Sequence, residues 1–181
     1  LPEEYATAFL ELQSNAPPMG WPFVKRRMQA ELGPGWQSLF QEFDHQASAA
    51  ASLGQVHKAI NHEGRQLACK LQYPEMGSAV EADLIQLKFI LKSFEMYSGA
   101  LDTENLHLEI GERLREELNY GLEAQHTKLF KEILIPFSFA DVPEVMDSLT
   151  TPRLLSMSWL EGKKLLTLTE SSQDIRNKAS A

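Results

Sequence analysis

The residues best suited to chemistry are a run of small side chains and a single lysine a short distance beyond it. Residues 49–54 read A-A-A-S-L-G, and Lys70 lies in the sequence L-A-C-K. Backbone N–H groups can approach phosphate oxygens closely only where the surrounding side chains are small. A lysine on a neighbouring strand adds a compact cation for the same oxygens. This combination predicts a phosphate-binding turn with Lys70 as its charged partner.

The spacing within the small-residue run narrows this prediction to one kind of nucleotide site. It follows the protein-kinase pattern G-x-G-x-x-G-x-V up to Val56, with alanine at the first two glycine positions. L-A-C-K corresponds in turn to the kinase V-A-I-K, whose lysine holds ATP phosphates. Alanine lacks the positive-φ freedom of glycine, so we expect a stiffer loop; for the run taken alone, a helix N-terminus or a plain turn is the alternative. The loop residues expected to contact the nucleotide are Ala49, Ala50, Ala51, Ser52 and Gly54.

Side-chain alternation along the predicted strand places Lys70 on a nucleotide-facing surface. With a period of two, Ala68 and Lys70 point to one side and Cys69 to the other. The small Ala68 side chain leaves room for a flat purine, and Val56 can cover the opposite side of that ring. Cys69 is expected in the core as a small buried hydrophobe.

Composition and charge favour a globular chain and disfavour a nucleic-acid partner. The 181 residues are 43% hydrophobic and 23% charged, with a net charge of -8. Nucleic-acid binding needs clustered Lys and Arg, and the one dense basic run, residues 25–27, reads as the solvated face of a helix rather than a lipid contact. No apolar stretch of about 18 residues could span a bilayer, so we expect this segment to be soluble.

The sequence contains no motif typical of a metal site or of two other common catalytic classes. The single cysteine cannot form an internal disulfide, and the five histidines show no metal-ligand spacing with acids or with Cys69. Neither the nucleophile elbow G-x-S-x-G nor the Walker loop G-x-x-x-x-G-K occurs. We therefore predict no metal ligands within this segment.

The elements expected to position these residues form an α+β lobe, residues 46–181, behind a helical extension, residues 1–45. The lobe is expected to be a small antiparallel sheet wrapped by four or five helices. The absence of an initial Met and an uncapped helix at the end suggest a piece of a longer protein. In chain order the expected elements are a helix from Pro2 to Pro17, a helix with the apolar stripe Phe23, Met28 and Leu32, a helix over 36–43, strands over 55–60 and 65–72, helices over 75–98 and 103–133, and a strand over 153–160.

Nearly the whole chain resembles one protein family. Residues 49–57, A-A-A-S-L-G-Q-V-H, resemble the alanine-rich A-A-A-S loop of the ABC1/ADCK/UbiB (AarF) family of atypical protein-kinase-like proteins. The resemblance implies a kinase-like N-lobe with an inserted helix over 75–98, whose apolar residues Ile85, Phe89, Leu91 and Met96 we expect in the core. Further matching stretches are residues 1–13, 16–18, 70–74, 116–124 and 152–162.

A kinase-like lysine needs a carboxylate on a helix to aim it at the phosphates. By periodicity alone, several acids of the second long helix could take this role, and the choice among them stays open. The resemblance assigns the role to Glu123. The competing acids are Glu109, Glu112, Glu116 and Glu117.

The sequence departs from the family at one motif position. Glu117 lies where the E-x-D motif of the family begins, but its aspartate is here Asn119. Asparagine keeps the shape and hydrogen bonding of aspartate without its charge. On one continuous helix, Glu117 and Glu123 would lie roughly 120° apart and serve different sites.

The resemblance also implies an adenine contact on the strand over 153–160. Backbone groups between Ser158 and Leu160 are expected to hydrogen-bond the adenine edge. Trp159 is expected to pack rather than to stack on the purine.

The resemblance implies the ATP-binding half of an atypical kinase or ATPase that supports ubiquinone or other isoprenoid-quinone biosynthesis. ATP or ADP is the expected ligand, with Mg held by residues beyond Ala181, because no catalytic-loop or metal-binding aspartate motif is present. Expected partners are a lipid or quinone precursor and quinone-biosynthesis proteins. The expected location is intracellular and at a membrane, on the bacterial cytoplasmic face or in a mitochondrion or plastid. A pseudokinase-like scaffold and a small-molecule phosphotransferase remain alternatives.

Overall fold

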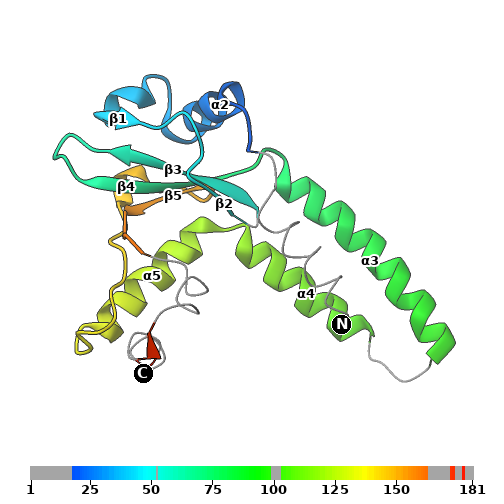
Figure 1. Ribbon diagram of the computed structural model, residues 1–181. Helices are drawn as coiled ribbons and strands as arrows, with labels where there is room; N and C mark the ends of the chain where they lie inside the picture. The colour runs from blue at the N-terminus through cyan, green and yellow to red at the C-terminus, as the bar shows by residue number, and fades with distance from the viewer. Residues whose placement is uncertain (1–17, 52, 99–102, 163–171, 174–176, 178–181) are drawn as a thin grey trace.

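The structure, a computed structural model, describes residues 18–51, 53–98, 103–162, 172–173 and 177. A small antiparallel sheet lies between α2 on one side and α5 on the other (Figure 1). The helix expected from Pro2 lies outside the described residues. In chain order the elements are α2 (Trp21–Leu32), η1 (Trp36–Leu39), β1 (Glu42–Phe43), β2 (Ala49–Ala51), β3 (Gly54–Ile60), β4 (Gln66–Gln72), α3 (Met76–Ser98), α4 (Thr103–Glu117), α5 (Tyr120–Leu134), η2 (Asp147–Leu149) and β5 (Leu154–Ser158).

Helix α2 forms where the sequence predicts a helix, but it buries a different stripe. Its first turn contains a proline, and it ends at Gly33, whose φ of 86° suits a residue without a side chain. Val24 and Met28 are fully buried against the sheet, whereas Phe23 is 50% exposed. The expected stripe was therefore wrong at Phe23, because Val24 and Met28, four residues apart, define the buried face.

The third expected helix, over 36–43, is short and is followed by a strand. Only Trp36–Leu39 is helical, and β1 pairs with β3 so that Phe43 lies opposite Ala59. Phe43 packs edge-on against Trp36, with ring centroids 5.1 Å apart. Burial in this aromatic cluster and pairing with β3 override the local helical pattern, so the prediction was wrong over residues 42–43.

The sheet has the order β1-β3-β4-β5, with β2 also paired to β3 and every pair antiparallel. The predicted hairpin is confirmed, and its register sets Val56 opposite Lys70. Strand β5 is shorter than the expected 153–160 and pairs with β4. Cys69 is fully buried in the core beneath α2, as predicted, and burial raises the pKa of its thiol to about 12.

The long helix expected over 103–133 is two helices. α4 ends at Glu117 and α5 begins at Tyr120, with Asn119 between them. The Asn119 side-chain oxygen accepts hydrogen bonds from the N–H groups of Gly121 and Leu122. Because a capping side chain competes with the continuing helix, the chain turns at this point, and the angle estimated for one continuous helix does not apply.

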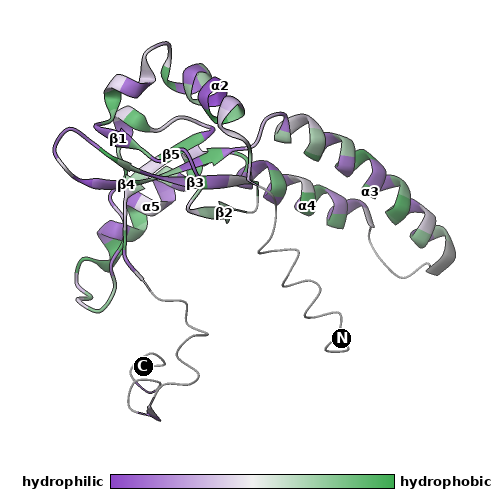
Figure 2. Cartoon of the chain, turned by 45° about the horizontal axis from the view of Figure 1, so that its top comes forward, coloured by the Kyte–Doolittle hydropathy of each residue, from purple (hydrophilic) through white to green (hydrophobic). Residues whose placement is uncertain are grey.

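Helices α3 and α4 lie side by side and extend away from the sheet, with apolar residues along α3 (Figure 2). Three residues expected in the core, Ile85, Phe89 and Met96, are exposed, Met96 to 87%. The prediction was wrong because only one face of α3 packs on α4, through residues such as Leu84. No helix in the described part of the chain is long and apolar enough to cross a membrane.

Removing the Asn119 cap should destabilise the fold. Asn119→Ala is expected to lower the free energy of unfolding by about 1 kcal/mol, because two N–H groups at the start of α5 lose their acceptor. Asn119→Asp is the control, since it keeps the acceptor and places a negative charge at a helix N-terminus. Urea unfolding of the three proteins measures the effect. Equal stability of wild type and Asn119→Ala would show that the cap does not stabilise the turn between α4 and α5.

Candidate functional site

An ion pair between β4 and α5 lies at the centre of the candidate nucleotide site. The Lys70 Nζ donates to both carboxylate oxygens of Glu123, at 2.8 and 2.7 Å. The Lys70 side chain is only 19% exposed, so solvent screens this pair less than a surface pair. Among the described residues, no other acid forms an ion pair with Lys70.

The other acids considered for this role lie elsewhere on α4. Glu109 and Glu112 are exposed, and Glu116 pairs with Arg113 at 2.9 Å. Glu117 is exposed and lines the same cavity as Lys70. Two of these acids, Glu116 and Glu117, line the cavity beside Lys70, but among the described residues only Glu123 forms an ion pair with the lysine, a choice that sequence periodicity could not make.

Tyr120 lies directly beneath the ion pair, and sequence reasoning gave it no role. The Lys70 Nζ lies 4.6 Å from the centre of the Tyr120 ring, within range of a cation–π contact. Tyr120 is buried, and burial followed by the charge of Glu123 raises the pKa of its hydroxyl above the usual range. That hydroxyl has no hydrogen-bond partner within the described residues. The signal available in the sequence was an aromatic residue directly after a capping asparagine.

The start of α5 is fixed by its own cap and by two hydrogen bonds to other segments. Besides the Asn119 cap, the Tyr120 N–H donates to the Pro152 carbonyl at 3.0 Å. The buried Gln72 side chain donates to the Leu118 carbonyl at 3.0 Å. These contacts place Glu123, one turn further along, over Lys70.

The small-residue run forms a hairpin rather than a helix N-terminus. Ala49 lies opposite Val56 and Ala51 opposite Gly54 on the paired strands β2 and β3. Ser52 lies outside the described residues. A side chain at Gly54 would place its Cβ 2.3 Å from the Leu71 carbonyl oxygen, so only glycine permits this approach of β3 to β4.

The residues predicted to hold nucleotide are not all brought to one cavity. A cavity of about 670 Å³ beside the ion pair is lined by Lys70, Glu117, Glu123 and Met157. Asn119 lines a different cavity, and the predicted nucleotide-binding alanines, Ala49, Ala50, Ala51 and Ala68, line neither one. Ala68 is nearly buried on the Lys70 side of β4.

The backbone at the end of β5 is partly engaged. The Ser158 N–H donates to the Glu144 carbonyl, and the Ser158 hydroxyl accepts from the Glu144 N–H. The backbone N–H of Trp159 donates to the Gln66 carbonyl, and the Trp159 ring lies under the Lys58 ammonium group. The Leu160 N–H makes no hydrogen bond to any other described residue. Within residues 158–160, the backbone N–H of Leu160 is therefore the one left without an acceptor among the described residues.

A sequence model of the ABC1 atypical kinase-like domain matches residues 11–180. The atypical kinase coq-8, mitochondrial, of Caenorhabditis elegans is 31% identical over 154 residues, which are 85% of this chain and 20% of that protein. The Arabidopsis thaliana protein Activity of BC1 complex kinase 8, chloroplastic, is 30% identical over 91% of this chain and 22% of its own length. The chain spans less than half the length of these relatives.

A solved structure is also similar. Rv3197 of Mycobacterium tuberculosis, determined in complex with erythromycin, superposes with a TM-score of 0.78 at 30% identity, covering 97% of this chain and 45% of that one. This likeness confirms the predicted α+β fold, a small antiparallel sheet with helices.

Gly54 should not tolerate a larger residue. Gly54→Ala is expected to lower the free energy of unfolding by about 1–3 kcal/mol, because the added Cβ would overlap the Leu71 carbonyl and force β3 away from β4. Gly77→Ala is the control, since a Cβ there meets no atom within 4 Å. Urea unfolding compares both with the wild type. A Gly54→Ala protein as stable as Gly77→Ala would show that the two strands can separate without cost.

Proposed function

The chain belongs to the ABC1 atypical kinase-like family, and from that premise we propose that it forms the ATP-binding N-lobe of an atypical kinase or ATPase. The observation that carries the proposal is the doubly hydrogen-bonded pair of Lys70 and Glu123. In kinases the equivalent pair aims the lysine at the nucleotide phosphates.

The geometry of the pair supports this role for Lys70. An ammonium group has three N–H donors, and Glu123 takes two of them. The third remains for a phosphate oxygen, and the Tyr120 ring beneath the nitrogen limits where it can point. Glu123 is therefore proposed as the residue that orients Lys70, rather than one that contacts the nucleotide.

The remaining residues of the proposed site surround this pair. Val56 lies opposite Lys70 on β3 and, with Ala68, would enclose the purine. Leu160 would donate its free N–H to the adenine edge, while the N–H of Ser158 is already engaged. The phosphates are proposed to lie against the backbone of the β2–β3 hairpin, residues Ala49, Ala50, Ala51, Ser52 and Gly54.

Magnesium normally bridges nucleotide phosphates in this kind of site. The described residues bring no three His, Cys, Asp or Glu side chains together as metal ligands. Both oxygens of Glu123 already accept from Lys70. We therefore assign no metal-dependent step to this lobe. Glu117 lines the cavity beside Lys70 and is proposed to face the nucleotide from α4.

The wider role proposed is support of ubiquinone or other isoprenoid-quinone biosynthesis at a membrane, with a lipid or quinone precursor, or pathway proteins, as partners. This rests on the family resemblance. The relatives named above include a mitochondrial and a chloroplastic protein, which agrees with an organellar setting.

The test is nucleotide binding by the full-length protein with and without the lysine. Lys70→Ala is expected to weaken ATP binding about ten- to hundredfold, because a charged hydrogen bond to phosphate is lost. Glu123→Gln should weaken it less, since the lysine keeps its charge but loses its orientation. Lys88→Ala, an exposed lysine on α3, is the matched control. Calorimetric titration with ATP and an ATPase assay provide the measurements.

Undiminished ATP affinity and activity in Lys70→Ala would refute the proposal. ATP binding without turnover in the wild type would instead favour the pseudokinase-like scaffold. Turnover that requires a small soluble acceptor would favour a phosphotransferase.

A further inference from the structure

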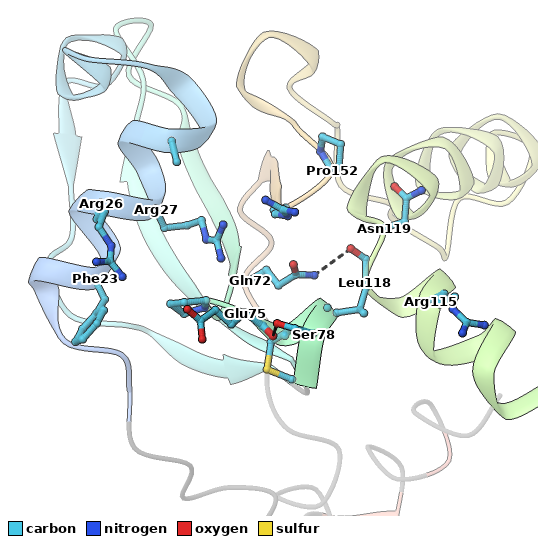
Figure 3. Close-up of a pocket in the computed structure, with 15 residues that line it drawn as sticks. Phe23, Arg26, Arg27, Gln72, Glu75, Ser78, Arg115, Leu118, Asn119 and Pro152 are labelled. Atoms are coloured by element: carbon cyan, nitrogen blue, oxygen red, sulfur yellow. Dashed lines mark hydrogen bonds between the residues drawn. The ribbon is translucent and has the colours of Figure 1, made fainter. Parts of the chain in front are cut away.

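A second cavity, of about 570 Å³, lies at the other side of the α4–α5 junction (Figure 3). Its walls come from α2, the start of α3, the end of α4 and the segment before β5. In Figure 3 the Arg27 side chain extends from α2 into the space between α2 and Gln72. The size suits a small ligand.

This cavity is basic although the chain carries a net charge of -8. Its lining includes one carboxylate, Glu75, and four guanidinium groups from three separate parts of the chain. The basic run over 25–27 is thus not simply a solvated face, because its last residue is only 13% exposed. The four arginines are Arg26, Arg27, Arg115 and Arg153.

Two of these arginines already have carboxylate partners. Arg115 makes two hydrogen bonds to Glu81, and Arg27 lies 3.5 Å from Glu31. The Arg27 Nε, however, is buried and has no hydrogen-bond partner among the described residues. A buried donor without an acceptor is costly, so a movement of Arg27 that brought this N–H to an acceptor on a ligand would be favourable.

The other two arginines have no acid partner in the described part of the chain. The Arg26 guanidinium lies over the Phe23 ring, 5.6 Å from its centre, and neither Arg26 nor Arg153 forms an ion pair with another described residue. Both are exposed at the rim of the cavity. Their charges are therefore available to an anion.

The N-terminus of α3 adds backbone donors from a further direction. Met76, Gly77 and Ser78 line the cavity, and their N–H groups bond to no other described residue. The first engaged N–H is that of Ala79, which donates to Glu75. In a helix of 23 residues, these free N–H groups and the aligned peptide dipoles favour an anion.

We propose that this cavity binds a phosphate group. Its donors approach from α2, from the start of α3 and from Arg153, so they surround the ligand on several sides. A tetrahedral dianion can accept from all of these directions, whereas a planar carboxylate offers two oxygens in one plane. The phosphate could belong to a soluble phosphate ester or to a lipid headgroup, which share this chemistry.

Proton–nitrogen NMR of the full-length protein tests the proposal with inorganic phosphate. Arg27→Lys identifies the Arg27 Nε–H signal, because lysine keeps the charge but has no Nε. Phosphate is expected to shift this signal saturably, relative to sodium chloride of equal ionic strength. The shift should persist in Lys70→Ala, since the nucleotide site is separate.

Substitutions at the rim provide the quantitative comparison. Arg153→Gln and Arg26→Gln should each weaken phosphate binding about three- to tenfold. Glu75→Gln should strengthen it about two- to threefold, because the only carboxylate of the lining is removed. Lys25→Gln is the matched control: it removes a charge from an exposed, neighbouring position outside the cavity and should change affinity less than about twofold.

The source of the phosphate is separated with vesicles of phosphatidylcholine, with and without phosphatidic acid. Binding that requires phosphatidic acid and Arg153 and is displaced by inorganic phosphate identifies a lipid headgroup. Binding of inorganic phosphate alone identifies a soluble ligand. The proposal is overturned if phosphate leaves the Arg27 signal unmoved, if Lys70→Ala abolishes the shift, or if Lys25→Gln weakens binding as much as Arg153→Gln.

Discussion

The arrangement of this lobe depends on a partly buried ammonium group held by both oxygens of one carboxylate. Moving Lys70 and Glu123 out of water costs free energy, and their attraction offsets that cost only when the geometry is good. Here two short hydrogen bonds and an aromatic ring provide the geometry. The pair joins a strand to a helix, so the positions of the sheet and α5 are fixed relative to each other.

The pair in turn depends on a break in a helix. Had α4 continued along its axis, Glu123 would not lie where α5 places it; instead the chain turns at Asn119. The cap satisfies N–H groups of the new helix, and Gln72 and Pro152 bind the backbone on either side of it. A neutral asparagine serves as well as an aspartate for this purpose, because both side chains offer an accepting oxygen. The fold is therefore compatible with the departure of the sequence at Asn119.

Much of the sheet could be predicted from the sequence, because a two-residue period and a turn signal are local. The hairpin and the burial of Cys69 follow from them. The partner of Lys70 could not be chosen by periodicity, since it depends on where α5 packs. The helix break was missed because neither of the two residues between α4 and α5 is Gly or Pro, although Asn119 is a preferred capping residue. The stripe of α3 that contains Ile85 was predicted to be buried but is exposed, because an apolar stripe in the sequence does not show whether another element packs against it.

The α4–α5 junction forms a wall shared by the two cavities. Lys70 and Gln72 project from the same face of β4, two residues apart, and Gln72 holds the Leu118 carbonyl. Leu118 lines the arginine-rich cavity, while Glu123, on the helix that begins directly after it, lines the cavity beside Lys70. Residues 26, 75, 115 and 153 are far apart in sequence, so no local sequence pattern predicts the cavity that they line. The same long-range packing that places Glu123 over Lys70 therefore also assembles the arginines, and one junction determines the shape of both sites.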